Sequence, residues 1–281
     1  MSLTNLIKNL HKAQGNPSLG PVIERYFMRK ANEFDEEKFR DRLTRFHPSQ
    51  ISYWGVCARA YYLSMKGETL GYPLQKPTPF ETSLLRVFEH GHSIHAMYQD
   101  KILGPAGVLY GKWELKGEVV EGFQPAPEWT YVEPRMWWSE KRMSGYCDGY
   151  LQIDNRWFVL EIKSSNDQSF RYLKRSNEPR AYHSRQAQFY MLSPHDLERK
   201  FEIEGAIILY VNKDTGEELD FYIENDPSRV EPLLKQIDVA IDSLDQSFIP
   251  TRVEDCKTIR SKRAKDCKVC NACFASGPNG R

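Results

Sequence analysis

The sequence predicts a fold of the α/β class, of the α+β kind, in which a central mixed sheet is flanked by helices. Residues 117–163 contain short alternating apolar and polar runs separated by Gly, Pro and Asn, a pattern typical of antiparallel strands. Segments with helical spacing lie on both sides of this region, and they do not alternate regularly with strands as in a doubly wound fold. These two observations favour a mixed architecture.

The expected elements follow from these periodicities. Helices are expected over residues 1–50, over the segment that starts near Ser49 or Ser52 and carries Cys57, and, after a loop at 67–79, at about 81–103. Strands are expected at 131–140, 145–153, 156–165, 205–213 and 218–225. Two further helices are expected at about 180–193 and 227–246, and a cysteine-rich tail follows them.

The composition is that of a folded, soluble chain. Of its 281 residues, 40% are hydrophobic and 12% are aromatic, which is enough to form a core. No run approaches the roughly 18 apolar residues of a membrane helix, and the N-terminal MSLTNLIKNLHKAQ lacks the features of a signal peptide. We therefore expect a cytoplasmic protein with no membrane partner. The net charge of +1 neither favours nor excludes nucleic acid, because phosphate binding depends on where cations gather.

The stretch GYCDGYLQIDNRWFVLEIKSS contains the most informative group of residues. A tight turn at 154–155 would place Asp148 opposite Glu161, whereas a turn at 155–156 would place it opposite Lys163. Either register brings these three side chains to one face of adjacent strands, because side chains alternate along a strand. Cross-strand Cβ atoms lie about 4.5–5.5 Å apart, so two carboxylates could share one divalent cation.

These residue types suit the hydrolysis of a phosphodiester. Two carboxylates hold a hard cation such as Mg²⁺ or Mn²⁺, which acidifies a bound water and polarises a phosphoryl oxygen. A lysine orients the water or stabilises the charge of the transition state. The alternative is a solvated strand face, but Glu161 lies in an apolar run, where a charge without a partner would be costly.

Two helical segments add candidates to this site. His95 in GHSIH could add an imidazole ligand, which would favour Mn²⁺ over Mg²⁺, although it could equally be an ordinary histidine at the core edge. His90 and His92 lie close to it in the sequence. Gln186 and Tyr190 are four residues apart on one helix face, so they could lean over the site or simply pack.

Taken in order, these motifs resemble those of the RecB/AddB-like branch of the PD-(D/E)XK nucleases, which includes the CRISPR-associated RecB-like exonucleases. They are SYWGVCARAYYL at 52–63, GHSIH at 91–95, GYCDG and EIK at 145–149 and 161–163, and QAQFY at 186–190. With the cysteine-rich tail, the resemblance covers roughly residues 49–273, most of the chain. It implies a restriction-endonuclease-like core and a divalent-metal mechanism.

The resemblance also implies roles for individual residues. The catalytic residues that it implies are Asp148, Glu161, Lys163, Gln186 and Tyr190. The ligands of Mg²⁺ or Mn²⁺ that it implies are His95, Asp148, Glu161 and Ile162.

Four of the six cysteines lie in the last 26 residues. Clustered cysteines in a reducing compartment bind metal more often than they form disulfides. The C-x2-C-x2-C spacing of Cys267, Cys270 and Cys273 lets three thiolates converge on one centre. Cys147 is expected to be a small buried residue.

The fourth ligand of this centre comes from the resemblance. Relatives in the nuclease branch join one N-terminal cysteine to three C-terminal ones around a [4Fe–4S] cluster, which implies Cys57. The family tail more often has a wider last gap, so Cys256 remains a possible substitute ligand. Structural Zn²⁺ is the alternative metal.

DNA contacts are expected from cations near these motifs, although charged runs are often only solvated faces. The candidates are Arg59, Arg171, Lys174, Arg175, Arg180 and Arg185, together with the run RSKRAK at 260–265.

The function expected is that of a metal-dependent DNA exonuclease acting in recombination, repair, replication or processing. An endonuclease or structure-specific nuclease on the same fold, and a non-catalytic DNA-binding or assembly module with a metal-stapled cap, are the alternatives. The chain has no helicase or P-loop motif, so a partner such as a helicase would have to supply ATP-driven unwinding. The expected segments are an N-terminal helical segment 1–48, a first cysteine region 49–79, a nuclease core 80–248 and a second cysteine region 249–281.

Overall fold

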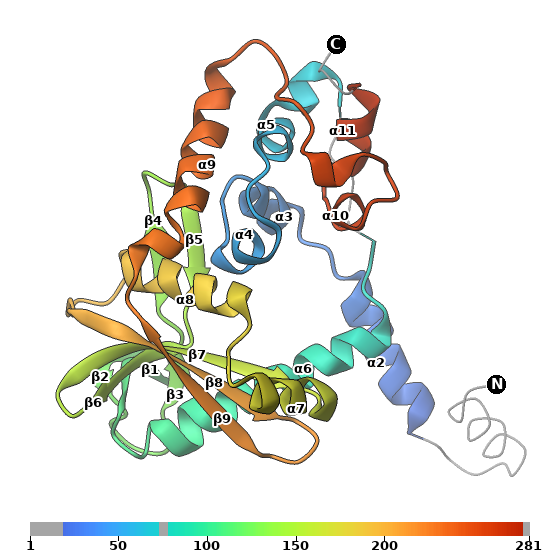
Figure 1. Ribbon diagram of the computed structural model, residues 1–281. Helices are drawn as coiled ribbons and strands as arrows, with labels where there is room; N and C mark the ends of the chain where they lie inside the picture. The colour runs from blue at the N-terminus through green and yellow to red at the C-terminus, as the bar shows by residue number, and fades with distance from the viewer. Residues whose placement is uncertain (1–18, 73–77, 278–281) are drawn as a thin grey trace, which may run out of the picture.

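A mixed sheet of seven strands lies at the centre of the fold, in the order β2-β1-β6-β7-β8-β9 with β3 paired to β1 (Figure 1). The computed structural model describes residues 19–72 and 78–277. Strands β7 and β8 are parallel and the other neighbouring pairs are antiparallel. The strands are β1 Leu109–Leu115, β2 Glu118–Phe123, β3 Thr130–Val132, β6 Gly149–Ile153, β7 Arg156–Ser165, β8 Ile203–Asn212 and β9 Glu218–Glu224, and a separate ribbon joins β4 Arg135–Trp138 to β5 Met143–Tyr146. The predicted class, a mixed sheet flanked by helices, is confirmed.

Helices cover both faces of this sheet. Helix α6 (Thr82–Ala96) and the π-helix η2 (Met97–Leu103) pack on one face, and α8 (Ala181–Leu192) packs on the other. The other α-helices are α2 Gly20–Asn32, α3 Glu36–Leu43, α4 Pro48–Trp54, α5 Ala58–Lys66, α7 Asp167–Ser176, α9 Glu231–Asp242, α10 Lys262–Lys265 and α11 Cys270–Ala275. The 3₁₀ turns are η1 Glu68–Leu70, η3 Pro227–Arg229, η4 Ser243–Asp245 and η5 Glu254–Cys256.

Side-chain alternation along β7 divides the hydrophobic core in two. Val159 faces the cluster that contains Phe189 of α8, whereas Leu160 and Ile162 face the cluster that contains Ile94 of α6. Glu161 and Lys163 therefore share the face of the sheet that α8 covers.

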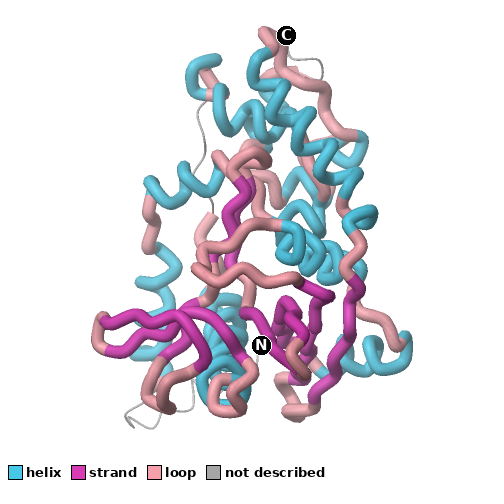
Figure 2. The backbone as a smooth tube through the Cα atoms, turned by 90° about the vertical axis from the view of Figure 1, so that its left-hand side faces the viewer, coloured by secondary structure: helices cyan, strands magenta, loops and turns pink. Residues whose placement is uncertain are grey.

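A helical cap, which we define as α3, α4 and α5 together with residues 249–277, lies above the sheet. Figure 1 shows the cap helices above the sheet, and Figure 2 shows most of the strands in the lower half of the molecule. Helix α4 packs on α8, and α5 contacts both α9 and α11. Segments from the two ends of the chain are thus brought side by side.

Parts of the expected N-terminal helix are found as α2 and α3. Residues 1–18 of that helix, residues 73–77 of the expected loop and residues 278–281 of the tail lie outside the described residues. Across the described segments, every helix is too short or too polar to cross a bilayer. The division of the chain into four segments stays a prediction.

Two expected strands are each divided in two, so the prediction was wrong there. The strand at 131–140 is broken at Glu133 and Pro134, because proline has no N–H for a sheet ladder. The strand at 145–153 is broken at Cys147 and Asp148. A Cβ on Gly149 would lie 2.4 Å from Leu109 Cδ1, so a residue without a side chain is needed where the chain enters the main sheet.

Strands β1 and β2 and helix α7 were missed by the sequence reasoning, although β2 lies in the region from which the sheet was inferred. Strand β1 precedes the region from which the sheet was inferred, and it pairs with β2, β3 and β6. Helix α7 has ordinary boundary signals, since the Asn166 side chain accepts a hydrogen bond from the Ser169 N–H and Asn177 ends the helix with a left-handed φ of 51°. These signals were present in the sequence but were not used.

The half-buried imidazole of His195 leads to a prediction about acid stability. It stacks on Phe201 with ring centroids 5.3 Å apart, and burial together with nearby Lys200 lowers the pKa of His195 to about 4. The unfolded chain therefore takes up this proton first as the pH falls, and stability is lost between about pH 6.5 and pH 4. Between these two pH values we expect His195→Phe to lose up to about 3 kcal/mol less free energy of unfolding than the wild type does. Urea unfolding across this pH range measures the difference. An unchanged slope of stability against pH would contradict this.

Candidate metal centre

The two strand breaks lie next to each other where the β4–β5 ribbon leaves the main sheet. The Cys147 N–H donates to the Pro134 carbonyl at 3.2 Å, which ties the two crossings together. Glu133 precedes Pro134 and Asp148 follows Cys147, so both carboxylates are held close together where strand β6 begins. The ribbon thus positions two carboxylates that belong to no regular strand.

The first of the two predicted hairpin registers is found. Asp154 and Asn155 form the turn with φ angles of 50° and 61°, which suits a tight two-residue hairpin. The ladder between β6 and β7 ends with Gly149 opposite Leu160. Asp148 lies one residue further and thus at the level of Glu161.

Asp148 is held from three sides. Its Oδ2 accepts the backbone N–H of Ile162, and its Oδ1 lies 3.2 Å from His95 Nδ1. The Gln99 side chain donates to the Asp148 carbonyl at 2.9 Å. Asp148 is 7% exposed, so the carboxylate is fixed and largely removed from water.

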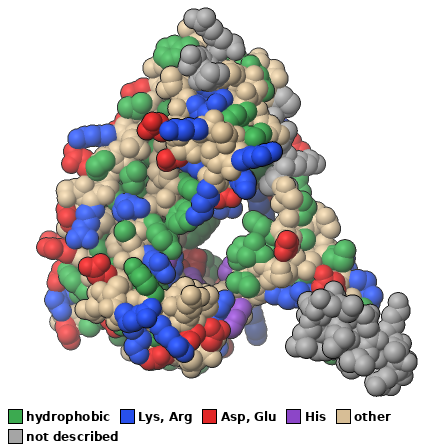
Figure 3. All heavy atoms as spheres, turned by 45° about the vertical axis from the view of Figure 1, so that its right-hand side comes forward, with side chains coloured by type: hydrophobic (Ala, Val, Ile, Leu, Met, Phe, Trp, Pro, Cys, Tyr) green, Lys and Arg blue, Asp and Glu red, His purple; other side chains and the backbone are tan. Residues whose placement is uncertain are grey.

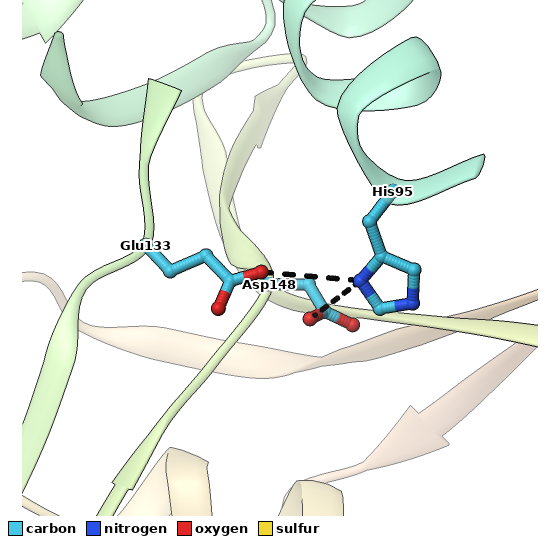
Figure 4. Close-up of side chains that lie close together, drawn as sticks. All are labelled: His95, Glu133 and Asp148. Atoms are coloured by element: carbon cyan, nitrogen blue, oxygen red, sulfur yellow. Dashed lines mark ion pairs between the residues drawn. The ribbon is translucent and has the colours of Figure 1, made fainter. Parts of the chain in front are cut away.

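Glu133 completes a three-residue cluster that the sequence reasoning missed. One ligand atom each from His95, Glu133 and Asp148 lies within 4.8 Å of the others, and Figure 4 shows the two carboxylates pointing toward the imidazole. The only sequence signal for Glu133 was a glutamate before a proline inside a strand-like run. His95 lies in this cluster, where it was expected.

Glu161 is the least satisfied group of the site. It is 2% exposed, and Lys163 donates to its Oε1. Within residues 19–72 and 78–277, no group donates a hydrogen bond to its Oε2. Burial, offset in part by Lys163 and reinforced by Asp148, raises the pKa of Glu161 to about 7. A buried carboxylate oxygen without a partner is unfavourable unless a cation or proton neutralises it.

The site holds excess negative charge that a proton on His95 offsets. Burial opposes the charged imidazole, but hydrogen bonds to Asp148 and Glu133 outweigh it and raise the pKa of His95 to about 10. Burial likewise opposes the Lys163 ammonium, and Glu161 outweighs it, so the pKa of Lys163 is raised. The pocket therefore favours cations.

The donor atoms fit a divalent metal ion. Carboxylate oxygens are the preferred ligands of Mg²⁺, and one imidazole makes the set suitable for Mn²⁺ as well. The bare Oε2 of Glu161 and the His95–Glu133–Asp148 cluster are the observations on which this fit depends. That the carbonyl of Ile162 is a further ligand stays a prediction.

Helix α8 covers the Glu161 side of the site. Gln186 donates to the Tyr190 hydroxyl at 3.2 Å, and both side chains are buried. A Cβ on Gly145 would lie 3.2 Å from Pro48 Cδ of α4 and 3.4 Å from the Tyr190 ring of α8, so both helices pack closely on the ribbon here. Burial, followed by the charge of Glu161, raises the pKa of Tyr190 well above its ordinary value, which keeps the phenol protonated.

A second group on α8 lies beside Lys163. Tyr210 is paired in register with Lys163 across β7 and β8, and its hydroxyl lies 2.7 Å from His183 Nδ1. The same hydroxyl accepts the Arg180 N–H, which leaves its hydrogen for the imidazole. Burial, followed by Lys163, lowers the pKa of His183 to about 3, so this ring is neutral.

Five cysteines gather in the cap, and Cys147 lies apart from them in the core. Cys57, Cys256, Cys267 and Cys273 line a cavity of about 240 Å³. Burial, followed by Cys57, Cys273 and Cys270, raises the pKa of Cys267 to about 12. Arg59 Nε donates to Cys273 Sγ at 3.2 Å. In the part of the chain that the structure describes, no three cysteine sulfurs lie within 4.8 Å of one another, so a metal on these thiols stays a prediction.

The cations expected to contact DNA have different surroundings. Arg59 is fully buried, and its guanidinium donates to Pro250 O, Cys273 O and Ser276 Oγ, so the expectation of a phosphate contact was wrong for it. Arg185 donates twice to the Ser52 carbonyl, at 3.0 and 2.6 Å.

The cations of α7 are exposed to solvent. Arg171 pairs with Asp167 at 2.6 Å, and Lys174 pairs with Glu217 at 2.5 Å. Arg175 is exposed on the same helix. Their part in DNA binding stays a prediction.

This chain is thus an α/β protein with a candidate divalent-metal centre next to the first residue of strand β6. No protein-family model and no curated protein matches the sequence. Among solved structures, the chain is similar to an alkaline exonuclease (LHK-Exo) from Laribacter hongkongensis, with 13% identity, a TM-score of 0.46 and coverage of 75% of this chain and 93% of that chain. The complex of LHK-Exo with dAMP gives a TM-score of 0.49 at the same identity and coverage. The protein SSO0001 shares 14% identity with a TM-score of 0.37, covering 80% of this chain and 85% of that one.

Proposed function

We propose that this chain is a divalent-metal-dependent DNA nuclease of the PD-(D/E)XK type, in its RecB-like branch, and that it acts as an exonuclease in DNA recombination, repair, replication or processing. The observation that supports this most is the buried Glu161 carboxylate, which has one oxygen on Lys163 and one without a donor in the described structure. Such a group is costly in a purely structural role. Its neighbours, the His95–Glu133–Asp148 cluster, supply the other ligands of a cation.

Different residues of the site would bind the metal and stabilise the charge of the transition state. Asp148, Glu161, Glu133 and His95 would hold the metal, and when bound, a divalent cation would polarise the scissile phosphate and acidify a water molecule. Lys163, held by Glu161, places an ammonium where negative charge grows in the transition state.

Helix α8 packs over the side of the site that contains Glu161. The buried side chains of Gln186 and Tyr190 bond to each other within α8, and Tyr190 lies close enough to Glu161 for that carboxylate to raise the pKa of the phenol. By covering the Glu161 side, the helix also excludes water from it.

The exonuclease assignment is tested with labelled linear and circular single-stranded and duplex DNA in the presence of Mn²⁺. We expect the wild type to degrade linear DNA only and Glu161→Gln to be inactive. Cutting of circles would replace the exonuclease by an endonuclease on the same fold. Equal behaviour of the wild type and Glu161→Gln would remove both.

Replacing Glu133 with Gln is expected to weaken Mn²⁺ binding about 10–100-fold, because the cluster loses one of its two carboxylates around His95. Isothermal titration calorimetry on the full chain measures this without a nucleic-acid substrate. The matched control is Glu140→Gln, which removes an exposed carboxylate from the turn of the same β4–β5 ribbon. Equal affinity in the wild type and Glu133→Gln would show that Glu133 is not a ligand.

For the cap we propose a [4Fe–4S] cluster on Cys57, Cys267, Cys270 and Cys273, with Cys256 as a possible substitute and structural Zn²⁺ as the alternative. Two observations support a metal there: Cys57, Cys256, Cys267 and Cys273 line one cavity, and buried Arg59 donates to Cys273 Sγ. A brown protein absorbing near roughly 400 nm would identify the cluster, and a colourless one with stoichiometric zinc would identify zinc. Comparing Cys57→Ser with Cys256→Ser then tells which cysteine is a ligand, because loss of metal follows only from removing one.

A further inference from the structure

A row of aromatic rings joins the cap to the face of the sheet that carries Lys163. Trp54 and Tyr53 end α4, with ring centroids 4.7 Å apart. Tyr53 lies 5.0 Å from Tyr182 at the start of α8, and Tyr182 lies 4.3 Å from His183. Through the bond of His183 to Tyr210, which is paired with Lys163, the row reaches the candidate metal centre.

The row is accessible to solvent, whereas rings that only pack in a core would be buried. Tyr53 is 45% exposed, and Trp54 and Tyr182 are half-buried. The helices that carry these rings are nonetheless fixed, because Arg185 donates twice to the carbonyl of Ser52, itself 1% exposed. The surface is therefore both rigid and open.

Cations accompany the rings. Lys262 Nζ lies 3.2 Å from the Tyr53 hydroxyl and 5.5 Å from the centroid of the Trp54 ring. Arg180, at the start of α8, lies 4.9 Å from the ring of Tyr172, which is 51% exposed. Figure 3 shows a hollow between the cap, the sheet and α6, with hydrophobic side chains and Lys and Arg around it. Aromatic faces interspersed with cations suit a ligand that carries both flat bases and phosphates.

We propose that Trp54, Tyr53 and Tyr182 form a binding track for one strand of DNA, with Lys262 and Arg180 contacting its phosphates. This inference rests on the proposed function, since the track leads to the site that would cut the strand. Bases of a duplex are stacked on each other and offer no free faces, so exposed rings select an unpaired strand. The positive charge of the track favours a polyanion such as a nucleic-acid strand and argues against a basic surface as its occupant.

The test measures binding and not cleavage. A fluorescently labelled oligonucleotide is titrated with the full chain in EDTA, as a single strand and as a blunt duplex, and anisotropy is recorded at two salt concentrations. We expect Tyr53→Ala and Tyr182→Ala each to weaken single-strand binding roughly tenfold and to leave duplex binding unchanged. Tyr53→Phe should bind as the wild type does, because the ring is kept. Lys262→Ala should reduce the salt dependence by removing a phosphate contact.

The control is Tyr222→Ala, which removes a tyrosine of similar exposure, 56%, from β9. Thermal unfolding of each variant shows that it is folded, and sedimentation shows whether the rings are a contact between copies of the chain. Unchanged single-strand affinity in Tyr53→Ala and Tyr182→Ala, equal loss for single strand and duplex, or a change of oligomeric state alone would each overturn the track.

The two proposals fail separately. If the wild type cleaves DNA and the tyrosine variants bind and cleave equally well, the track is wrong and the nuclease stands. If the wild type binds a single strand through these rings but cleaves nothing with Mn²⁺ or Mg²⁺, the track stands and the nuclease is wrong.

Discussion

Asp148→Asn is expected to reduce metal-dependent DNA cleavage by about 10³-fold or more, the size of loss typical when a group that acts in the transition state is removed. The change keeps the shape of the side chain, and the amide still has an oxygen to accept the Ile162 N–H. It removes the negative charge that lies 3.2 Å from His95 Nδ1. The cluster of His95, Glu133 and Asp148 then keeps only the carboxylate of Glu133. The loss should therefore come from the metal and not from the fold.

The measurement is single-turnover cleavage of a linear substrate together with Mn²⁺ titration of each protein. The matched control is Asp154→Asn, the same substitution in the exposed hairpin turn of the same two strands, where asparagine also tolerates the left-handed φ of 50°. We expect the control to cleave at the wild-type rate. A rate within tenfold of the wild type for Asp148→Asn would exclude this carboxylate from the metal centre.

Arg59→Met is expected to destabilise the protein by about 3–5 kcal/mol, because several buried acceptors lose their donor at once. The guanidinium is fully buried and fixes the end of the chain through Cys273 Sγ, the Cys273 carbonyl and Ser276 Oγ. Without it, these acceptors lose their donor in a place that water does not reach. Residues 249–277 would then separate from α5.

Urea unfolding at neutral pH, on metal-loaded and on metal-free protein, measures this effect. The control is Arg40→Met on the surface of α3, where Arg40 bridges Glu36 and Glu68 in solvent, and it should change stability little. Equal free energies of unfolding for Arg59→Met and wild type would show that the buried network contributes nothing. A larger loss in the metal-loaded protein would indicate that Arg59 also stabilises the thiolates of a bound metal.

The hairpin of the site could be predicted from the sequence because its determinants are local. Asp154 and Asn155 accept left-handed φ values, and the apolar run around Glu161 is long enough to be a buried strand. The sequence left two turns open, and the turn found at 154–155 fixes the register that places Asp148 at the level of Glu161. The prediction that His95 belongs to the site needed one further assumption, namely that its amphipathic helix would pack beside this hairpin.

Other features depended on contacts between distant segments. Glu133 enters the site because the β4–β5 ribbon crosses out of the main sheet beside Asp148, and no local periodicity encodes where two breaks will meet. Arg59 looked like a phosphate ligand in the sequence, yet the C-terminal segment folds over it and its donors are used there. The row from Trp54 to His183 likewise exists only because α4 packs on α8.

The sequence by itself therefore determined the class of fold and the presence of the hairpin, since backbone preferences and alternation act over a few residues. The tertiary structure alone decided which distant side chains complete the candidate metal centre, which arginine is buried and which rings stay open to solvent. Those outcomes depend on how helices and strands far apart in the chain pack, and burial, which sets the cost of each charge, is defined only after that packing is complete.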